Sequence, residues 1–149
     1  MPKQGYQNVV LMCLKVREQS IIDDFNFLQN WDEKYEYIIS LGKEISNNVT
    51  GLKSPENLIK GCQSSVWLSS TLRSGKVFFF ADSDALITKG LIAILLKIFS
   101  DAKPKEIALF ELNLINEIGL NQHLSMTRSN GLNKMIEKIK KISLNYLKE

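Results

Sequence analysis

The residue best placed to do chemistry in this sequence is Cys62, which directly follows a glycine in the run Gly61-Cys62-Gln63-Ser64-Ser65. Glycine adopts positive φ angles at no steric cost, so Gly61 allows a sharp turn that presents the thiol at the tip of a loop. Free cysteines are usually buried and behave as small hydrophobic side chains. The polar, flexible neighbours of Cys62 make a poor core segment, so a structural thiol and a reactive thiol both stay open.

Cys62 reacts as a nucleophile only in the thiolate form, and an ordinary thiol with a pKa near 8.5 is only about 3 % ionised at pH 7. The cations that could lower this pKa are Lys60, two residues away, and Arg128, if the fold brings it close. A guanidinium at Arg128 could hold a thiolate, a persulfide or a carboxylate of a partner protein. We therefore expect Arg128 to lie beside the Cys62 loop or to take part in docking.

His123 and Cys13 are the other residues to consider for thiol chemistry. His123 is the sole histidine of the chain, and a pair with Cys62 is conceivable, although a lone histidine is more often an ordinary surface or hydrogen-bonding residue. Cys13 lies between bulky apolar residues with no nearby charge that would lower its pKa. We interpret Cys13 as structural or incidental.

Other kinds of site find no support in the sequence. One loop cysteine cannot build a thiolate-rich zinc or iron–sulfur site, and no cluster of His, Cys and Asp has metal-ligand spacing. The glycines fit neither nucleotide-binding fingerprint. Ser64 and Ser65 lack the nucleophile elbow of a serine hydrolase. We expect no metal and no cofactor in this chain, and either thiol chemistry at Cys62 or none.

The composition is that of an ordinary globular protein, with 149 residues, 44 % of them hydrophobic, and 19 basic against 16 acidic residues. This length suits one domain. The net charge of +3 does not by itself imply a nucleic acid partner, and no apolar run approaches the roughly 20 residues of a membrane span. Two cysteines do not make a disulfide framework, so a reducing compartment is the simplest setting. We expect a cytoplasmic protein, or one of an organelle such as a plastid.

The elements that must position Cys62 follow from apolar periodicity. Residues 1–19 are weakly patterned and predict a mobile tail or a short strand. Ser20 indicates the start of a first helix, and Asn30 with Glu33 indicates the capped start of a second. A polar loop then leads to the cysteine.

After this loop, two alternating runs predict strands over residues 65–72 and 76–81, joined by a short hairpin that contains glycine. The second run is apolar on both faces, which implies that both sides of the sheet are buried, at least in part, so helices should cover the sheet. A helix is expected over residues 85–99, with Ser83 or Asp84 supplying its cap.

Shorter helical segments follow, and residues 132–146 carry the period of a last helix, although Asn130-Gly131 is also a turn signal. The basic residues of this end of the chain are Arg128, Lys134, Lys138, Lys140, Lys141 and Lys148. They form either a solvated helix face or a surface that docks an acidic partner. The pattern as a whole predicts one α+β domain over residues 20–149, in which N- and C-terminal helices pack around a small antiparallel sheet.

Four groups of short motifs occur in order along the chain. They are Trp31-Asp32-x-Lys34-Tyr35-x-Tyr37 with Leu41-Gly42-Lys43, Gly61-Cys62-Gln63-Ser64 with Val66-Trp67, Ser83-Asp84-Ala85 with Lys89-Gly90-Leu91, and His123-Leu124-Ser125 with Thr127-Arg128-Ser129-Asn130-Gly131-Leu132. In this order they resemble the SufE family of sulfur acceptors, over most of the chain from about Phe25 to Ile142. The resemblance implies an α+β fold similar to that of iron–sulfur scaffold proteins.

The resemblance also implies that Cys62 is the family's sulfur-accepting cysteine. It would take persulfide sulfur from a SufS-type cysteine desulfurase, whose cofactor is pyridoxal phosphate, enhance that enzyme's activity and pass the sulfur to an iron–sulfur assembly scaffold. The residues that the motifs imply for loop support or partner docking are Gly61, Gln63, Asp84, His123 and Arg128. For Asp84 we expect mainly capping and loop support. The protein would be a sulfur-transfer partner rather than a classical enzyme, acting as a monomer or homodimer.

Two residues depart from the family pattern: Lys34 stands where arginine is usual, and Ser65 stands where glutamine is common. A lysine cannot make the bidentate bond of an arginine, so a contact at Lys34 would be weaker.

Two other functions stay open. One is a non-covalent activator of the desulfurase that carries no sulfur. The other is a general thiol oxidoreductase, which the lack of a Cys-x-x-Cys pair disfavours.

Overall fold

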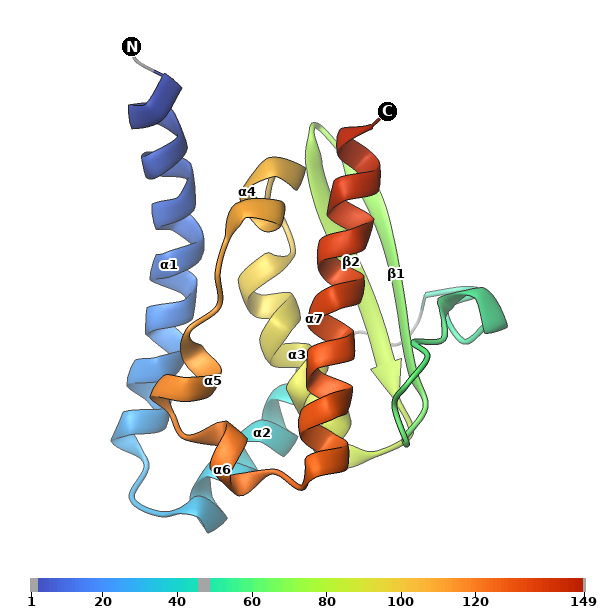
Figure 1. Cartoon of the computed structure of the whole chain (residues 1–149). Coiled ribbons are helices and arrows are strands. Elements are labelled where there is room, and N and C mark those ends of the chain that lie inside the picture. Colours follow the sequence, from blue (N-terminus) through green and yellow to red (C-terminus); the bar gives the residue numbers. More distant parts are fainter. Residues whose placement is uncertain (1–2, 46–48, 149) are drawn as a thin grey trace.

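A computed structural model of the chain describes residues 3–45 and 49–148, and the side chains from Cys13 onward within these ranges. Its elements, in chain order, are α1 (Lys3–Phe27), α2 (Trp31–Glu44), the 3-10 turn η1 (Pro55–Asn57), β1 (Val66–Arg73), β2 (Lys76–Ser83), α3 (Leu86–Phe99), α4 (Pro104–Leu109), α5 (Leu114–Glu117), α6 (Leu120–His123) and α7 (Met126–Leu147). Figure 1 shows a single hairpin with the helices packed beside it. The predicted α+β class is confirmed.

The two strands pair antiparallel, from Val66 opposite Ser83 to Arg73 opposite Lys76. Ser74 and Gly75 form the connection, and both have positive φ, 52° and 76°. A two-residue turn of this kind matches the right-handed twist of the strands it joins. The predicted hairpin is therefore confirmed, and its connection is one residue shorter than expected.

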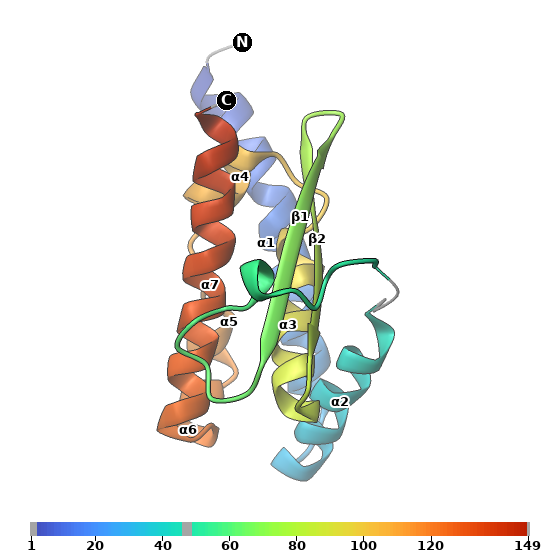
Figure 2. The ribbon, with the colours of Figure 1, turned by 90° about the vertical axis from the view of Figure 1, so that its right-hand side faces the viewer.

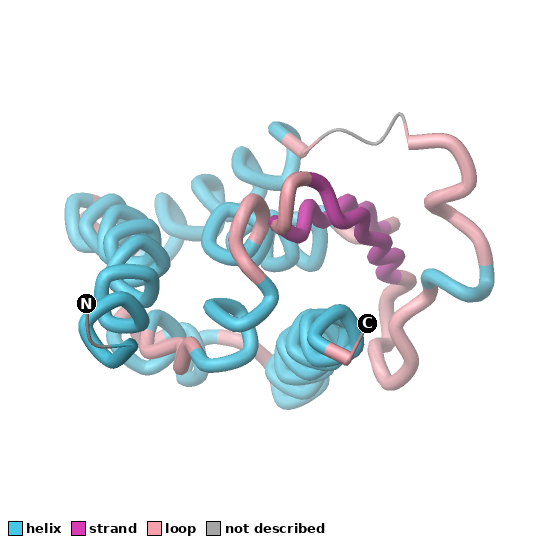
Figure 3. The backbone as a smooth tube through the Cα atoms, turned by 90° about the horizontal axis from the view of Figure 1, so that it is seen from above, coloured by secondary structure: helices cyan, strands magenta, loops and turns pink. Residues whose placement is uncertain are grey.

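The inner face of the sheet carries the alternating buried residues Val66, Leu68, Val77, Phe79 and Ala81. Helices α3 and α7 pack on this face. Figure 3 shows the helices on one side of the strands, and the loop that follows α2 on the other. The outer aromatic residues of β2 are half-exposed, which agrees with the expected burial of both sides at least in part, and the helices cover the inner face.

Helix α3 is the centre of the core, and ten of its fourteen residues are buried. Helix α2 packs against it at a glycine contact. A Cβ atom placed on Gly90 would lie 2.1 Å from the carbonyl oxygen of Ile38, and one on Gly42 would lie 2.8 Å from the nitrogen of Gly90. These two glycines therefore allow the close approach of the two helices.

Helix α1 corrects the expectation of a tail over residues 1–19. The helix is continuous through Ser20, and Leu14 is fully buried in the core. Glu18, only 1 % exposed, accepts hydrogen bonds from the backbone N–H groups of Asn113 and Leu114, at 2.7 and 3.0 Å. The sequence pattern does not indicate this helix, because the inward-facing Glu18 is charged and interrupts the period of apolar residues. Residues 1 and 2 lie outside the described residues.

The side chain of Arg17 joins α1 to the end of α3. Its guanidinium donates to the carbonyl oxygens of Ile98, Ser100 and Asp101, at 2.8 to 2.9 Å. These groups lie at the C-terminal end of α3, where backbone carbonyls lack helical partners and attract cations. The second half of α1 is therefore part of the folded core.

The helix starts follow the sequence in some places and not in others. Asn30 caps α2 as expected, accepting from the N–H of Glu33 at 2.9 Å. Helix α7 starts at Met126, with Ser125 as the cap, and runs straight through the Asn130-Gly131 turn signal. Gly131 is buried inside the helix, where packing overrides its local turn preference. None of the described helices is long and apolar enough to cross a membrane.

Candidate functional site

Cys62 lies on the loop between η1 and β1, and this loop runs against α7 (Figure 2). Gly61 has a φ of +93°, so the chain turns there in a way that favours glycine. The turn directs the half-buried Cys62 side chain onto α7, where its thiol donates to the carbonyl oxygen of Gly131 at 3.6 Å. A Cβ atom on Gly131 would lie 3.6 Å from the sulfur, so the thiol rests directly on the glycine.

The thiol faces a small polar cavity of about 250 Å³. Its lining comes from three parts of the chain: the Cys62 loop, the first turn of α3, and the start of α7. The lining residues are Cys62, Gln63, Ser64, Thr88, Ser125, Thr127, Arg128 and Gly131. The fold therefore brings Arg128 and Gln63 beside Cys62, as expected, while the roles of these two residues stay predictions.

The loop is fixed to β2 by the backbone of Ser65. Its N–H donates to the Asp84 carboxylate at 3.0 Å, and its carbonyl accepts from the Ser83 hydroxyl at 2.7 Å and from the Asp84 N–H at 3.3 Å. Asp84 does not cap α3, because the N-cap residue is Ala85 and no side chain bonds there as a cap. The expected capping role is therefore wrong. The carboxylate instead holds the residue that ends the cysteine loop.

Burial raises the pKa of the Cys62 thiol above its ordinary value, and the positive charge of Lys134 opposes this shift only in part. The aliphatic stem of Lys134 packs on the loop, since a Cβ atom on Gly61 would lie 3.2 Å from its Cγ. The cation acting on the thiol is therefore Lys134, and the expectation that Lys60 or Arg128 would lower this pKa is wrong for this conformation. The thiol is protonated at neutral pH while it occupies the cavity.

His123 does not pair with Cys62. Its imidazole stacks on the indole of Trp31, with ring centroids 3.9 Å apart and an interplanar angle of 17°, and its backbone oxygen accepts from the Tyr35 hydroxyl. It is not among the described residues that line the cavity. Its place in the structure is at the contact between α2 and the end of α6.

Cys13 is exposed on α1 and is likewise absent from the cavity lining. Within the described part of the chain, Cys62 is thus the one thiol of this site. No group of three or more His, Cys, Asp or Glu residues in that part could hold a metal ion. The arrangement can therefore bind or transfer a group on one sulfur, but it offers no second thiol to form an intramolecular disulfide.

The site residues that were not predicted from the sequence are Ser64, Thr88, Ser125, Thr127 and Gly131 in the cavity lining, and Lys134 beside the loop. Thr88 is a buried polar residue in an apolar helix, and this mismatch could have marked it. Gly131 and Lys134 lie about 70 positions along the chain from Cys62, and nothing local to either one indicates the contact.

The sequence profile of the SufE family, described as an Fe–S metabolism associated domain, matches residues 19–143. The chain belongs to the SufE family. An uncharacterized SufE-like protein of Rhizobium meliloti (strain 1021) is 42 % identical over 125 residues, which cover 80 % of this chain and 89 % of that protein. Another, from Rhizobium etli, is 41 % identical over 125 residues, with 80 % and 84 % covered.

The solution structure of a hypothetical protein from Thermus thermophilus has the same fold as this SufE protein. The TM-score is 0.75 at 13 % identity, over 89 % of this chain and 97 % of that one. At this identity the likeness supports the fold alone. Family membership confirms the resemblance that the motifs suggested and associates the protein with iron–sulfur metabolism.

Proposed function

We propose that this SufE protein accepts sulfur on Cys62 from a SufS-type cysteine desulfurase, increases that enzyme's turnover and passes the sulfur to an iron–sulfur assembly scaffold. The observation that carries the proposal is a single thiol at the tip of a glycine-hinged loop. One long contact to Gly131 and a three-bond attachment at Ser65 hold this loop in its cavity. Such a loop can move out to a partner.

The transfer needs no oxidant or reductant. The Cys62 thiolate attacks the outer sulfur of the persulfide on the desulfurase. A new S–S bond forms on Cys62, the S–S bond on the partner breaks, and the partner's cysteine leaves as a thiolate that takes up the proton given up by Cys62. The pyridoxal phosphate chemistry that frees sulfur from cysteine belongs to the desulfurase.

The cavity supports both halves of this cycle. A protonated, half-buried thiol is a poor nucleophile, so the resting state protects Cys62 from oxidation. After transfer, the Arg128 guanidinium at the cavity can pair with a negatively charged persulfide. The lack of a second thiol in the lining means that no neighbouring cysteine releases the bound sulfur by forming a disulfide.

Mass spectrometry of the protein after incubation with a SufS-type desulfurase and free cysteine tests the proposal. Peptides that contain Cys62 should gain sulfur, whereas peptides that contain Cys13 should not. Cys62→Ser should lose both the added sulfur and the stimulation of the desulfurase, and Cys13→Ser should keep both. Full stimulation by Cys62→Ser would rule out sulfur carriage and support a non-covalent activator. Turnover of a disulfide substrate without desulfurase would instead indicate a thiol oxidoreductase.

A further inference from the structure

A groove separate from the cysteine cavity runs between α7 and the segment that leads from η1 to the Cys62 loop (Figure 2). Its volume is about 530 Å³. The lining residues are Pro55, Glu56, Leu58, Ile59, Lys60, Lys134, Glu137, Lys138 and Lys141. The lining therefore holds four lysines against two glutamates and is basic overall.

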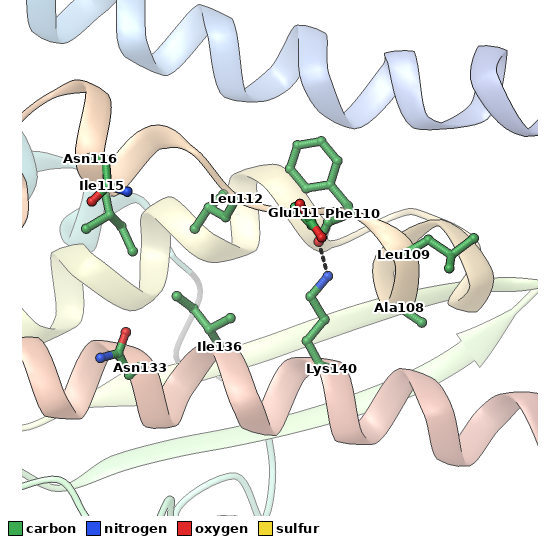
Figure 4. Close-up of a pocket in the computed structure, with 10 residues that line it drawn as sticks. All are labelled: Ala108, Leu109, Phe110, Glu111, Leu112, Ile115, Asn116, Asn133, Ile136 and Lys140. Carbon is green, nitrogen blue, oxygen red and sulfur yellow. Dashed lines mark hydrogen bonds between the residues drawn. The ribbon is translucent and has the colours of Figure 1, made fainter.

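One lysine of α7 points away from this groove. The Nζ atom of Lys140 donates to the carbonyl oxygens of Ile107 and Phe110, at the C-terminal end of α4, and lies 5.3 Å from the centre of the Phe99 ring (Figure 4). Both contacts suit an ammonium group. The expectation that the basic residues of α7 form one solvated or docking face is therefore wrong for Lys140, which fixes α4 against α7.

The other three, here called the groove lysines, are Lys134, Lys138 and Lys141. They are spaced by four and three residues, so they lie along one face of α7 over about 10 Å. Among the described residues, only Lys134 of these three has an ion pair, with Glu137 at 3.4 Å. Such an exposed pair stabilises little, so a carboxylate of a partner can replace Glu137 at small cost.

The opposite wall of the groove is held in place by β1 and is partly apolar. The N–H of Ile59 donates to the carbonyl oxygen of Val66 at 2.8 Å, and Leu58 forms an isolated bridge with Trp67. The side chain of Leu58 stays 39 % exposed at the groove. Because a strand and a helix hold the two walls, the groove is formed before a partner binds, and binding requires little ordering.

One end of the groove meets the cysteine loop. Lys60 directly precedes Gly61, and the stem of Lys134 packs on this glycine, since a Cβ atom there would lie 3.2 Å from the Lys134 Cγ. A segment bound in the groove therefore lies beside the residue at which the loop turns. The thiol of Cys62 rests on α7 before transfer, so a protein that draws the loop out of its cavity has to approach along this helix.

We propose that this groove binds an acidic segment of the desulfurase that supplies sulfur to Cys62. The inference rests on the sulfur transfer proposed above and assigns the surface that brings the two proteins together. Carboxylates spread over about 10 Å of the segment pair with the groove lysines, and an apolar side chain between them contacts Leu58.

A nucleic acid fits this groove less well than an acidic peptide. Glu56 and Glu137 lie among the lysines of the lining. A phosphate backbone carries a charge at every nucleotide and would be repelled by both. A peptide can place its carboxylates opposite the lysines and uncharged side chains opposite the glutamates.

The test measures the dissociation constant of the desulfurase complex by calorimetry. It is carried out on the full chain with Cys62→Ser, so that the result does not depend on sulfur transfer. Lys138→Glu/Lys141→Glu should weaken binding at least about tenfold, because two ion pairs become repulsive contacts. The matched control is Lys15→Glu/Lys105→Glu, which reverses the charge of two exposed lysines on α1 and α4 and should change the affinity less than about twofold.

A neutral variant guards against a folding defect in the charge-reversed protein. Lys138→Gln/Lys141→Gln should weaken binding about threefold, since it removes the ion pairs without adding repulsion. Its affinity should also fall less steeply than that of the parent as the salt concentration is raised, because screening then acts on fewer charge pairs. An unchanged salt dependence would contradict the proposal.

Cross-linking with a carbodiimide, which joins an amine to a carboxylate in contact with it, identifies the occupant. We expect the groove lysines and Lys60 to link to one acidic segment of the desulfurase. Changing the linked carboxylates to lysines should restore the affinity for Lys138→Glu/Lys141→Glu and weaken binding of the parent. Links scattered over the surface of the desulfurase, or a swap that restores nothing, would overturn the proposal.

The remaining outcomes separate this inference from sulfur transfer. Equal affinities of the groove and control variants, with sulfur found on Cys62 of the wild type, would overturn the groove alone. A loss of affinity confined to the groove variants supports the groove even if Cys62 gains no sulfur. A short single-stranded RNA that binds more tightly than the desulfurase, and is released by Lys138→Glu/Lys141→Glu, would overturn the proposal in favour of a nucleic acid.

Discussion

Replacing Asp84 by alanine should release the Cys62 loop while the core stays folded. The variant removes one of three hydrogen bonds to the Ser65 backbone, the one at 3.0 Å from the Ser65 N–H to the carboxylate. The other two, from the Ser83 hydroxyl and the Asp84 N–H, remain. Asp84 is exposed, so its bond contributes about 1 kcal/mol. The equilibrium between the closed and the open loop should therefore shift roughly fivefold toward the open state.

The alkylation rate of Cys62 in the native protein measures this shift. A half-buried, protonated thiol reacts with iodoacetamide mainly from the open loop, so the rate follows the open population. Peptide mass spectrometry separates Cys62 from the exposed Cys13, which serves as an internal reference. We expect the rate at Cys62 to rise about fivefold in Asp84→Ala and the rate at Cys13 to stay the same.

The control variant is Asp23→Ala, which removes an exposed carboxylate on α1 that bonds only to Gln19 among the contacts of the described side chains. It should leave the rate at Cys62 unchanged. Asp84→Asn keeps an acceptor oxygen and should give a smaller increase than Asp84→Ala. A Cys62 rate in Asp84→Ala within a factor of about 1.5 of the wild type would show that the carboxylate does not hold the loop closed.

Three further changes test the scaffold by urea denaturation. Gly90→Ala should lower the free energy of unfolding by about 3 kcal/mol, because the new Cβ atom would lie 2.1 Å from the backbone oxygen of Ile38, which cannot move alone. Glu18→Ala should cost about 2 to 4 kcal/mol, since two backbone N–H groups lose their acceptor, and Glu18→Gln should cost clearly less. At Asp82, burial favours the neutral form, but the Ser83 N–H and two lysines outweigh it and lower the pKa. Its stabilising effect is thus present above the unfolded pKa of about 3.9 and is lost as the pH falls through the folded pKa, so Asp82→Asn should destabilise more at pH 7 than at pH 3.

The local elements of this fold could be predicted because short-range patterns specify them. The alternation of apolar residues identified both strands, and Asn30 with Glu33 identified the start of α2. The tail prediction failed for the opposite reason. Glu18 looks like a surface residue in its own neighbourhood, and only the distant N–H groups of Asn113 and Leu114 give it a reason to be buried. No local pattern contains that information.

The candidate site likewise combines local features, which could be predicted from the sequence, with long-range contacts, which could not. Gly61 and Cys62 could be found because a thiol after a turn glycine is a local signal, and the motif order suggested the family. The direction of the pKa shift could not be found in this way. It depends on burial against Gly131 and on the charge of Lys134, both supplied by a helix about 70 residues further along the chain. Charges close in sequence, such as Lys60, were therefore a poor guide to the electrostatics of the thiol.

The burial of the Cys62 side chain in the cavity links the exposure of its thiol to the ionisation of that thiol. Burial is the main cause of the raised pKa, so any motion that draws the loop out of the cavity also removes that cause. The pKa of the thiol then returns toward 8.5, and a larger fraction becomes thiolate at the moment when the sulfur can meet a partner. A loop loosened by Asp84→Ala should accordingly show not only faster alkylation but also a lower apparent pKa in the pH profile of that rate. An unchanged pH midpoint with a faster rate would mean that the thiol is reached inside its cavity, without the loop moving.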